Sequence, residues 1–264
     1  MRLLAIILSC VLGGAAGATQ RFLVPIHLVE PVNGDAGSRW ASELTVLNTG
    51  TTGAYIENYG TCAPTGGPCI YPLFPRVAES GTPVRDVSFT IPAAMLIVED
   101  QYVDQLVFSA RVRDLSRNTQ SWGTWLPVVP ESAAVHGTLT LLDVPISAGF
   151  RQTLRVYSFD IANGRSVLVR VYGAVAPDPA NPTTYTQPNP LLGETVLPLR
   201  RAEGLRAAPL YAEIGNLATI ANVTGYDKVW LTIEPQGAFG VWGMVSITNN
   251  TTQEVTMIVP HRSH

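Results

Sequence analysis

Residues 150–159 read FRQTLRVYSF, a stretch in which hydrophobic and polar side chains alternate. Successive side chains of a β-strand point to opposite faces, so Phe150, Leu154 and Val156 share one face. The polar residues at 151, 153 and 155 lie on the other face. Alternation of this kind is typical of a strand that buries one side. The stretch therefore predicts a β-strand that contributes to a hydrophobic core.

The same pattern occurs earlier in the chain. Residues 40–48 read WASELTVLN and match residues 150–156 in spacing at Trp40, Leu44 and Val46. Each stretch precedes a second strand that ends in Tyr-Gly, and a Trp-Gly pair occurs later in each half. These pairs stand at 59–60 and 172–173 for Tyr-Gly, and at 122–123 and 242–243 for Trp-Gly. We expect an internal repeat of about 110 to 120 residues.

Short β-rich runs bounded by Gly, Pro, Asn and Asp recur along the whole chain, and helical periodicity is nearly absent. This rhythm predicts an all-β protein of the sandwich or barrel type, which the repeat divides into two tandem domains. We expect a signal peptide at 1–18, a first sandwich at 19–129 and a second at 130–264, joined by a short, stiff link at 127–134. Irregular pieces are expected at 61–83 and 176–192, and short helices at 213–222 and near 93–102.

Two further segments carry a resemblance. Residues 114–130 read DLSRNTQSWGTWLPVVP and residues 141–160 read LLDVPISAGFRQTLRVYSFD. They resemble segments of uncharacterised secreted proteins of environmental bacteria, Acidobacteria among them, that are built from tandem immunoglobulin-like modules. The resemblance spans most of the chain after residue 18. It implies an exported protein that folds as two tandem immunoglobulin-like antiparallel β-sandwiches, and it implies no activity and no catalytic residues.

The N-terminus has the features of a secretory signal. Arg2 supplies a positive charge, residues 3–12 are apolar, and Ala16, Gly17 and Ala18 form a small-residue cleavage site. The apolar run is too short to span a bilayer, which takes roughly 20 residues. An alternative interpretation is that Cys10 is lipidated and anchors the protein. We therefore expect a secreted, periplasmic or cell-surface protein with no membrane span.

Two cysteines remain after the signal, Cys62 and Cys69, in the stretch YGTCAPTGGPC at 59–69. An even pair in an exported chain is typical of a disulfide. A zinc site would need about four ligands, and a thioredoxin-like centre would need the shorter C-x-x-C spacing. The sequence therefore predicts a structural disulfide between Cys62 and Cys69. No metal or cofactor is expected.

Composition and motifs argue against two classes of function. Charged residues make up 14% of the chain and the net charge is −3, so no basic face for nucleic acid is expected. The signatures G-x-S-x-G, H-E-x-x-H, the P-loop and G-x-G-x-x-G do not occur. We therefore expect no catalytic residues. If the protein is an enzyme with an unfamiliar site, the acids at 99–104 and His136 are the first suspects.

The chain has five tryptophans, which could provide flat apolar surfaces for a sugar ring or anchors for a protein partner. Trp40, Trp122 and Trp242 occupy repeated positions, so we expect them in the cores. Trp125 has no aromatic counterpart in the second half and is the candidate contact residue for a partner or glycan. The remaining one is Trp230.

These observations favour a non-catalytic exported protein for surface interaction, adhesion or scaffolding, whose partner is a protein or glycan at the cell exterior. A carbohydrate-binding module that uses exposed Trp and Tyr side chains is the alternative, and an enzyme is the second alternative. The sequence does not identify the ligand.

Overall fold

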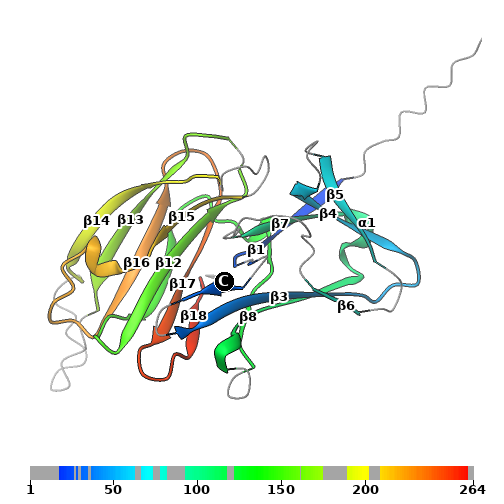
Figure 1. Ribbon diagram of the computed structural model, residues 1–264. Helices are drawn as coiled ribbons and strands as arrows, with labels where there is room; N and C mark the ends of the chain where they lie inside the picture. The colour runs from blue at the N-terminus through cyan, green and yellow to red at the C-terminus, as the bar shows by residue number, and fades with distance from the viewer. Residues whose placement is uncertain are drawn as a thin grey trace, which may run out of the picture.

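The computed structural model describes residues 18–26, 28, 31–34, 37–62, 67–73, 78–81, 93–117, 122–160, 162–174, 189–201 and 209–260. The predicted signal peptide before Ala18, with Cys10, lies outside this part of the chain. The structure is all-β and has four antiparallel sheets, which confirms the predicted class (Figure 1).

The first sandwich is formed by two sheets. One has the strand order β10-β1-β7-β4-β5 and the other the order β2-β3-β8-β9, with β6 also paired to β3. The strands are β1 (Thr19–Val24), β2 (Val32–Asn33), β3 (Arg39–Asn48), β4 (Ala54–Cys62), β5 (Gly67–Leu73), β6 (Ala78–Gly81), β7 (Ala94–Glu99), β8 (Leu106–Asp114), β9 (Thr124–Leu126) and β10 (Val129–Pro130).

The second sandwich has the sheets β11-β16-β13-β14 and β15-β12-β17-β18. Its strands are β11 (Leu139–Pro145), β12 (Phe150–Ser158), β13 (Ser166–Gly173), β14 (Leu191–Pro198), β15 (Leu210–Ile214), β16 (Lys228–Pro235), β17 (Val241–Asn249) and β18 (Val255–Ile258). The helical segments of the described chain are α1 (Asp100–Val103) and three 3₁₀ turns, η2 (Leu115–Arg117), η3 (Glu131–Ala133) and η4 (Leu217–Thr219).

Both sandwiches follow one strand order. The series β1, β3, β4, β5, β6, β7, β8 and β9 pairs in the same way as β11, β12, β13, β14, β15, β16, β17 and β18. In an immunoglobulin constant-type domain the first two strands are neighbours in one sheet. Here β11 pairs with β16 while β12 pairs with β15 and β17. The sandwiches thus share the two-sheet architecture of that domain and differ from it in strand order.

The two central ladders correspond residue by residue. In the first sandwich β3 pairs with β8 from Trp40↔Asp114 to Asn48↔Leu106, and in the second β12 pairs with β17 from Phe150↔Asn249 to Ser158↔Val241. The predicted match of 40–48 with 150–156 therefore has a structural counterpart. The predicted match of Trp122 with Trp242 is wrong. When the two ladders are aligned, the residue of the first sandwich at the position of Trp242 is Val107.

Each sandwich has a hydrophobic core, and the first core is shared. The core of the second sandwich contains only its own residues, among them Leu154 and Val156. The core of the first sandwich also contains Tyr157, Phe159, Trp242 and Met244 from the second. The outer face of the sheet β15-β12-β17-β18 therefore covers one edge of the first sandwich (Figure 1).

The segment predicted as a link is part of this packed structure. β10 pairs with β1, Val129 is buried, and the segment continues to Val135, which bridges to Val241. Arg21 of β1 forms an ion pair with Glu131 and donates a hydrogen bond to the carbonyl of Phe159 at 2.7 Å. The predicted boundary between residues 129 and 130 falls inside β10.

The prediction that residues 61–83 are irregular is partly wrong, because the strands β5 and β6 lie within this segment. β5 is an edge strand of its sheet, and an edge strand tolerates proline because one row of its backbone N–H groups needs no partner. The helix expected at 213–222 is reduced to the 3₁₀ turn η4, and the one near 93–102 to α1. Residues 175–188, most of the second irregular piece, lie outside the described chain. No helix in the described part has the length and apolar character needed to cross a membrane.

Candidate functional site

The outer face of the sheet β3-β8-β9 carries the two most exposed large hydrophobic side chains of the described structure, Trp122 and Trp125, together with Val107. Trp122 is 68% exposed, Trp125 59% and Val107 53%. β3, β8 and β9 alternate, so their buried residues face the core and the intervening ones face outward. We call this surface the tryptophan face and define it by Leu47, Val107, Arg111, Trp122 and Trp125.

Arg111 occupies the middle of the tryptophan face. Its guanidinium lies 4.0 Å from the centre of the Trp122 ring, close enough for a cation–π contact. Its Nε donates a hydrogen bond to Oε2 of Glu43 at 2.7 Å, and Arg113 forms an ion pair with the other oxygen of Glu43. Trp125 is the cross-strand partner of Arg111 on β9. One indole ring therefore lies against a cation that is held in place by a carboxylate, and a second exposed indole stands on the neighbouring strand.

The tryptophans are only partly where the sequence predicts them. Trp242 is buried, as predicted, and Trp40 packs partly buried against the first core. The prediction that Trp122 is a core residue is wrong: it precedes β9, and Gly123 has a φ of 97°, so the chain turns before the strand begins. Trp125, the candidate contact residue, faces solvent. Trp230 stacks on Tyr172 with 4.1 Å between ring centres.

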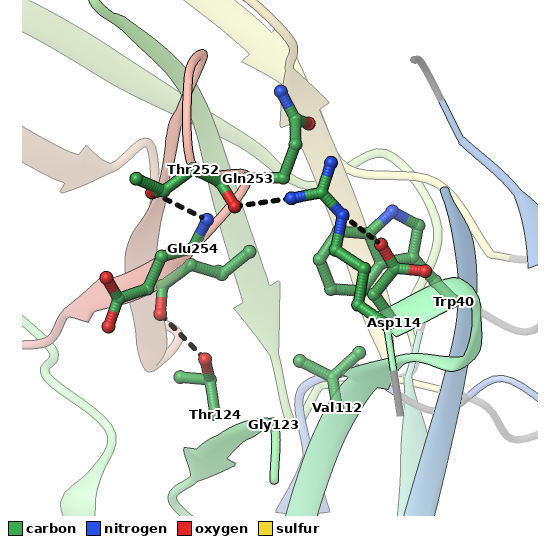
Figure 2. Close-up of a pocket in the computed structure, with 10 residues that line it drawn as sticks. Trp40, Val112, Asp114, Gly123, Thr124, Thr252, Gln253 and Glu254 are labelled. Carbon is green, nitrogen blue, oxygen red and sulfur yellow. Dashed lines mark hydrogen bonds and ion pairs between the residues drawn. The ribbon is translucent and has the colours of Figure 1, made fainter. Parts of the chain in front are cut away.

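A second candidate is a cavity of about 240 Å³ at the junction of the two sandwiches. Figure 2 shows Trp40 and Asp114 on one side of it and Thr252 and Glu254, from the turn between β17 and β18, on the other. Arg117 crosses this junction and donates a hydrogen bond to the carbonyl of Thr252 at 2.6 Å. The remaining lining residues are Val112, Gly123, Thr124, Gln253 and Val255.

The polar groups of this cavity are used to hold the structure together. Asp114 is buried, and its Oδ1 accepts hydrogen bonds from the backbone of Arg39 at 2.8 Å and from Ser116 at 2.6 Å and 3.0 Å. Burial raises the pKa of Asp114, but these hydrogen bonds and the charge of Arg117 outweigh it and lower the pKa. Thr124 Oγ1 donates to the carbonyl of Val255 at 2.6 Å. The Asp114 contacts hold the end of β8 within the first sandwich, and the hydrogen bonds of Arg117 and Thr124 fasten that sandwich to the β17–β18 turn and to the start of β18.

The residues that would support an enzyme are not brought together. Glu99 and Asp100 lie at the end of β7 and the start of α1 in the first sandwich, whereas exposed His136 precedes β11 in the second. The described residues contain no group of three or more His, Cys, Asp or Glu side chains that could hold a metal ion. Among the described groups, the shifted carboxyl pKa values, those of Asp114 and Asp160, arise from turn and strand-end hydrogen bonds.

The predicted disulfide involves two neighbouring strands. Cys62 ends β4 and Cys69 lies in β5, and the register pairs Cys62 with Gly67 and Cys69 with Asn58 across a β-bulge. The side chains of both cysteines lie outside the described part of the structure. The bond stays a prediction.

No protein-family model, curated protein or solved structure matches this chain.

Proposed function

We propose that the protein is a non-catalytic exported β-sandwich protein that acts in surface interaction, adhesion or scaffolding, with the tryptophan face as its contact surface. The observation that carries the proposal is the exposure of Trp122 and Trp125 on one sheet face. Trp is the residue most enriched at binding hot spots, because a large rigid ring buries much apolar area at a small entropy cost. Export is supported by the signal-like residues 1–18. An exported chain with an even pair of cysteines in turn supports the disulfide between Cys62 and Cys69.

A glycan is the second candidate partner. The specific observation in its favour is the combination of two exposed indole rings with the Arg111–Glu43 pair on the same sheet face. Indole rings offer flat apolar faces to the C–H side of a sugar, and charged groups at their edge can hydrogen-bond its hydroxyl groups.

Retention on a panel of immobilised targets tests the proposal. The panel contains envelope proteins and polysaccharides of the producing cells, and the protein itself. We expect at least one target to retain the wild type and to retain the double variant Trp122→Ala/Trp125→Ala at least tenfold less. Tyr55→Ala is the matched control, because Tyr55 is 49% exposed and lies outside this face. Equal retention of wild type and double variant by every target would refute the proposal.

The disulfide has its own test. Peptide mapping of the exported protein without reduction should give one peptide pair joined through Cys62 and Cys69. Two free thiols at these positions would refute the bond.

A further inference from the structure

The contact between the two sandwiches is a template for a second contact. The edge of the first sandwich at β1 and β9 is covered by the outer face of the sheet β15-β12-β17-β18. Tyr157 donates a hydrogen bond from its hydroxyl to the carbonyl of Pro25, directly after β1, and Thr124 of β9 bonds to Val255. An outer sheet face here meets a different type of surface, the edge of a sandwich where its first and last strands lie, which the short strand β10 also borders.

The first sandwich has its own copy of the contacting face. The matched ladders place Leu47 where the second sandwich has Tyr157. The cross-strand partners of these two residues are Val107 and Trp242, so those positions also correspond.

The next strand extends the correspondence. Trp125 pairs with Arg111 on β8 in the way that Met257 pairs with Ser246 on β17. Trp242 is part of the shared core, and Met257 packs against it. The hydrophobic residues of the tryptophan face on β3, β8 and β9 therefore occupy the positions that the second sandwich uses for contact.

The second sandwich has its own copy of the covered edge. Its strands β11 and β18 correspond to β1 and β9. A groove of about 470 Å³ lies between them, lined mainly by hydrophobic residues that include Leu142, Phe150 and Ile258. Leu142 is 44% exposed. We call this surface the edge groove.

We propose that a second copy of this chain binds its tryptophan face to the edge groove, so that copies join head to tail. The proposal rests on the proposed function and names the partner. Each new contact repeats the internal one: an outer sheet face covers the edge formed by the first and last strands of a sandwich. A contact between two different surfaces leaves one of each free at the ends of a dimer, so assembly continues to longer chains or closes a ring.

The surfaces favour a second copy over a glycan at the positions that align with the internal contact. Leu47 and Val107 are aliphatic and offer no hydrogen bonds to sugar hydroxyl groups, whereas they match a groove with an apolar lining. Arg111 is already neutralised by Glu43 and needs no charged partner.

Sedimentation velocity and light scattering over a range of protein concentrations test the proposal. We expect wild-type mass to rise with concentration beyond that of a dimer. Val107→Lys/Trp125→Lys removes the face and Leu142→Lys removes the groove, and each should weaken association at least about 30-fold, the size of a hot-spot loss. Val196→Lys is the matched control, because Val196 is 57% exposed on β14, away from both surfaces. Thermal unfolding checks that all variants fold.

Mixing the two variants is the decisive measurement. The face variant keeps a groove and the groove variant keeps a face, so the mixture should form a one-to-one complex and stop there. A wild type that stays monomeric at all concentrations, or a groove variant that associates like the wild type, would overturn the head-to-tail contact. If the face variant then loses only polysaccharide retention, a glycan is the partner and the proposed function stands. If it loses no interaction, the proposed function fails as well.

Discussion

Replacing Tyr157 by Phe tests the shared core directly. The hydroxyl of Tyr157 is buried completely and donates a hydrogen bond to the carbonyl of Pro25 in the other sandwich. The substitution keeps the ring and removes one donor, so it leaves a carbonyl of the interface without that partner. An unsatisfied buried polar group costs about 1 to 3 kcal/mol. We expect the free energy of unfolding to fall by this amount, and the midpoint temperature by about 2 to 4 °C for each kcal/mol.

The pH dependence of the stability difference between wild type and Tyr157→Phe provides a second, independent test. Burial raises the pKa of Tyr157 above its ordinary value of 10.0. Above pH 10 the tyrosine ionises in the unfolded chain before it ionises in the folded one, so the unfolded state binds fewer protons and wild-type stability falls. The loss approaches about 1.4 kcal/mol per pH unit. Phe cannot ionise, so the advantage of the wild type over the variant should shrink by about 1.4 kcal/mol between pH 8 and pH 11.

Urea unfolding followed by tryptophan fluorescence at pH 8 and pH 11 measures both effects. The other tyrosines ionise in both proteins, so their contributions cancel in the difference. Tyr55→Phe is the control, since Tyr55 is half exposed and its substitution should change stability by less than about 0.5 kcal/mol. Equal stability of wild type and Tyr157→Phe at pH 8, or a difference that does not change at pH 11, would refute the role assigned to this hydroxyl.

Three further outcomes follow from the interface. Trp242→Ala should destabilise the protein by about 3 to 5 kcal/mol in calorimetry, because it empties a buried site between the sandwiches. Gly123→Ala should cost more than about 1 kcal/mol in urea unfolding, because its φ is 97° and a Cβ would lie 2.5 Å from the carbonyl oxygen of Val112. Asp114→Ala should destabilise at pH 7 and progressively less as the pH falls below 3.8. The folded pKa is lowered, so the stability that Asp114 provides is present above its unfolded value of 3.8 and is lost as pH falls through the folded pKa.

The inward faces of the strands could be predicted from the sequence because alternation follows from strand geometry. Leu154 and Val156 are buried on the side that the pattern of 150–159 indicates, and Phe150 on the same side packs, partly buried, against the second core. The outward face of the same strand was missed. Tyr157 and Phe159 are hydrophobic residues on the polar side of the pattern, and a strand of this composition is typical of burial on both faces. That signal could have indicated that something covers this sheet.

The mistake about Trp122 has a different origin. The equivalence of Trp122 and Trp242 was predicted from a shared Trp-Gly pair, and a match of two residues carries no information about register. Register is set by long ladders, and the nine-residue pairings of β3 with β8 and β12 with β17 place Val107 opposite Leu47 and Trp242 opposite Tyr157. Trp125 was predicted to be a contact residue because no aromatic residue was found at the corresponding position of the second half. Its counterpart is Met257, which packs against the shared core.

The distribution of charge between the two matched faces supports this view of the tryptophan face. β8 carries Arg111 and Arg113 at the positions of Ser246 and Thr248, which lie outside the shared core. The charges at these two positions keep the face compatible with water, and they do not occupy the positions that correspond to the contact residues of the second sandwich. Leu47, Val107 and Trp125 remain hydrophobic at contact positions. Ser109, at the position of Met244, and Thr49, which follows the ladder at the position of Phe159, are polar. A face that needed only to be soluble would place its charges without regard to the contact pattern of the other sandwich, so the separation argues that these three side chains are there to be covered.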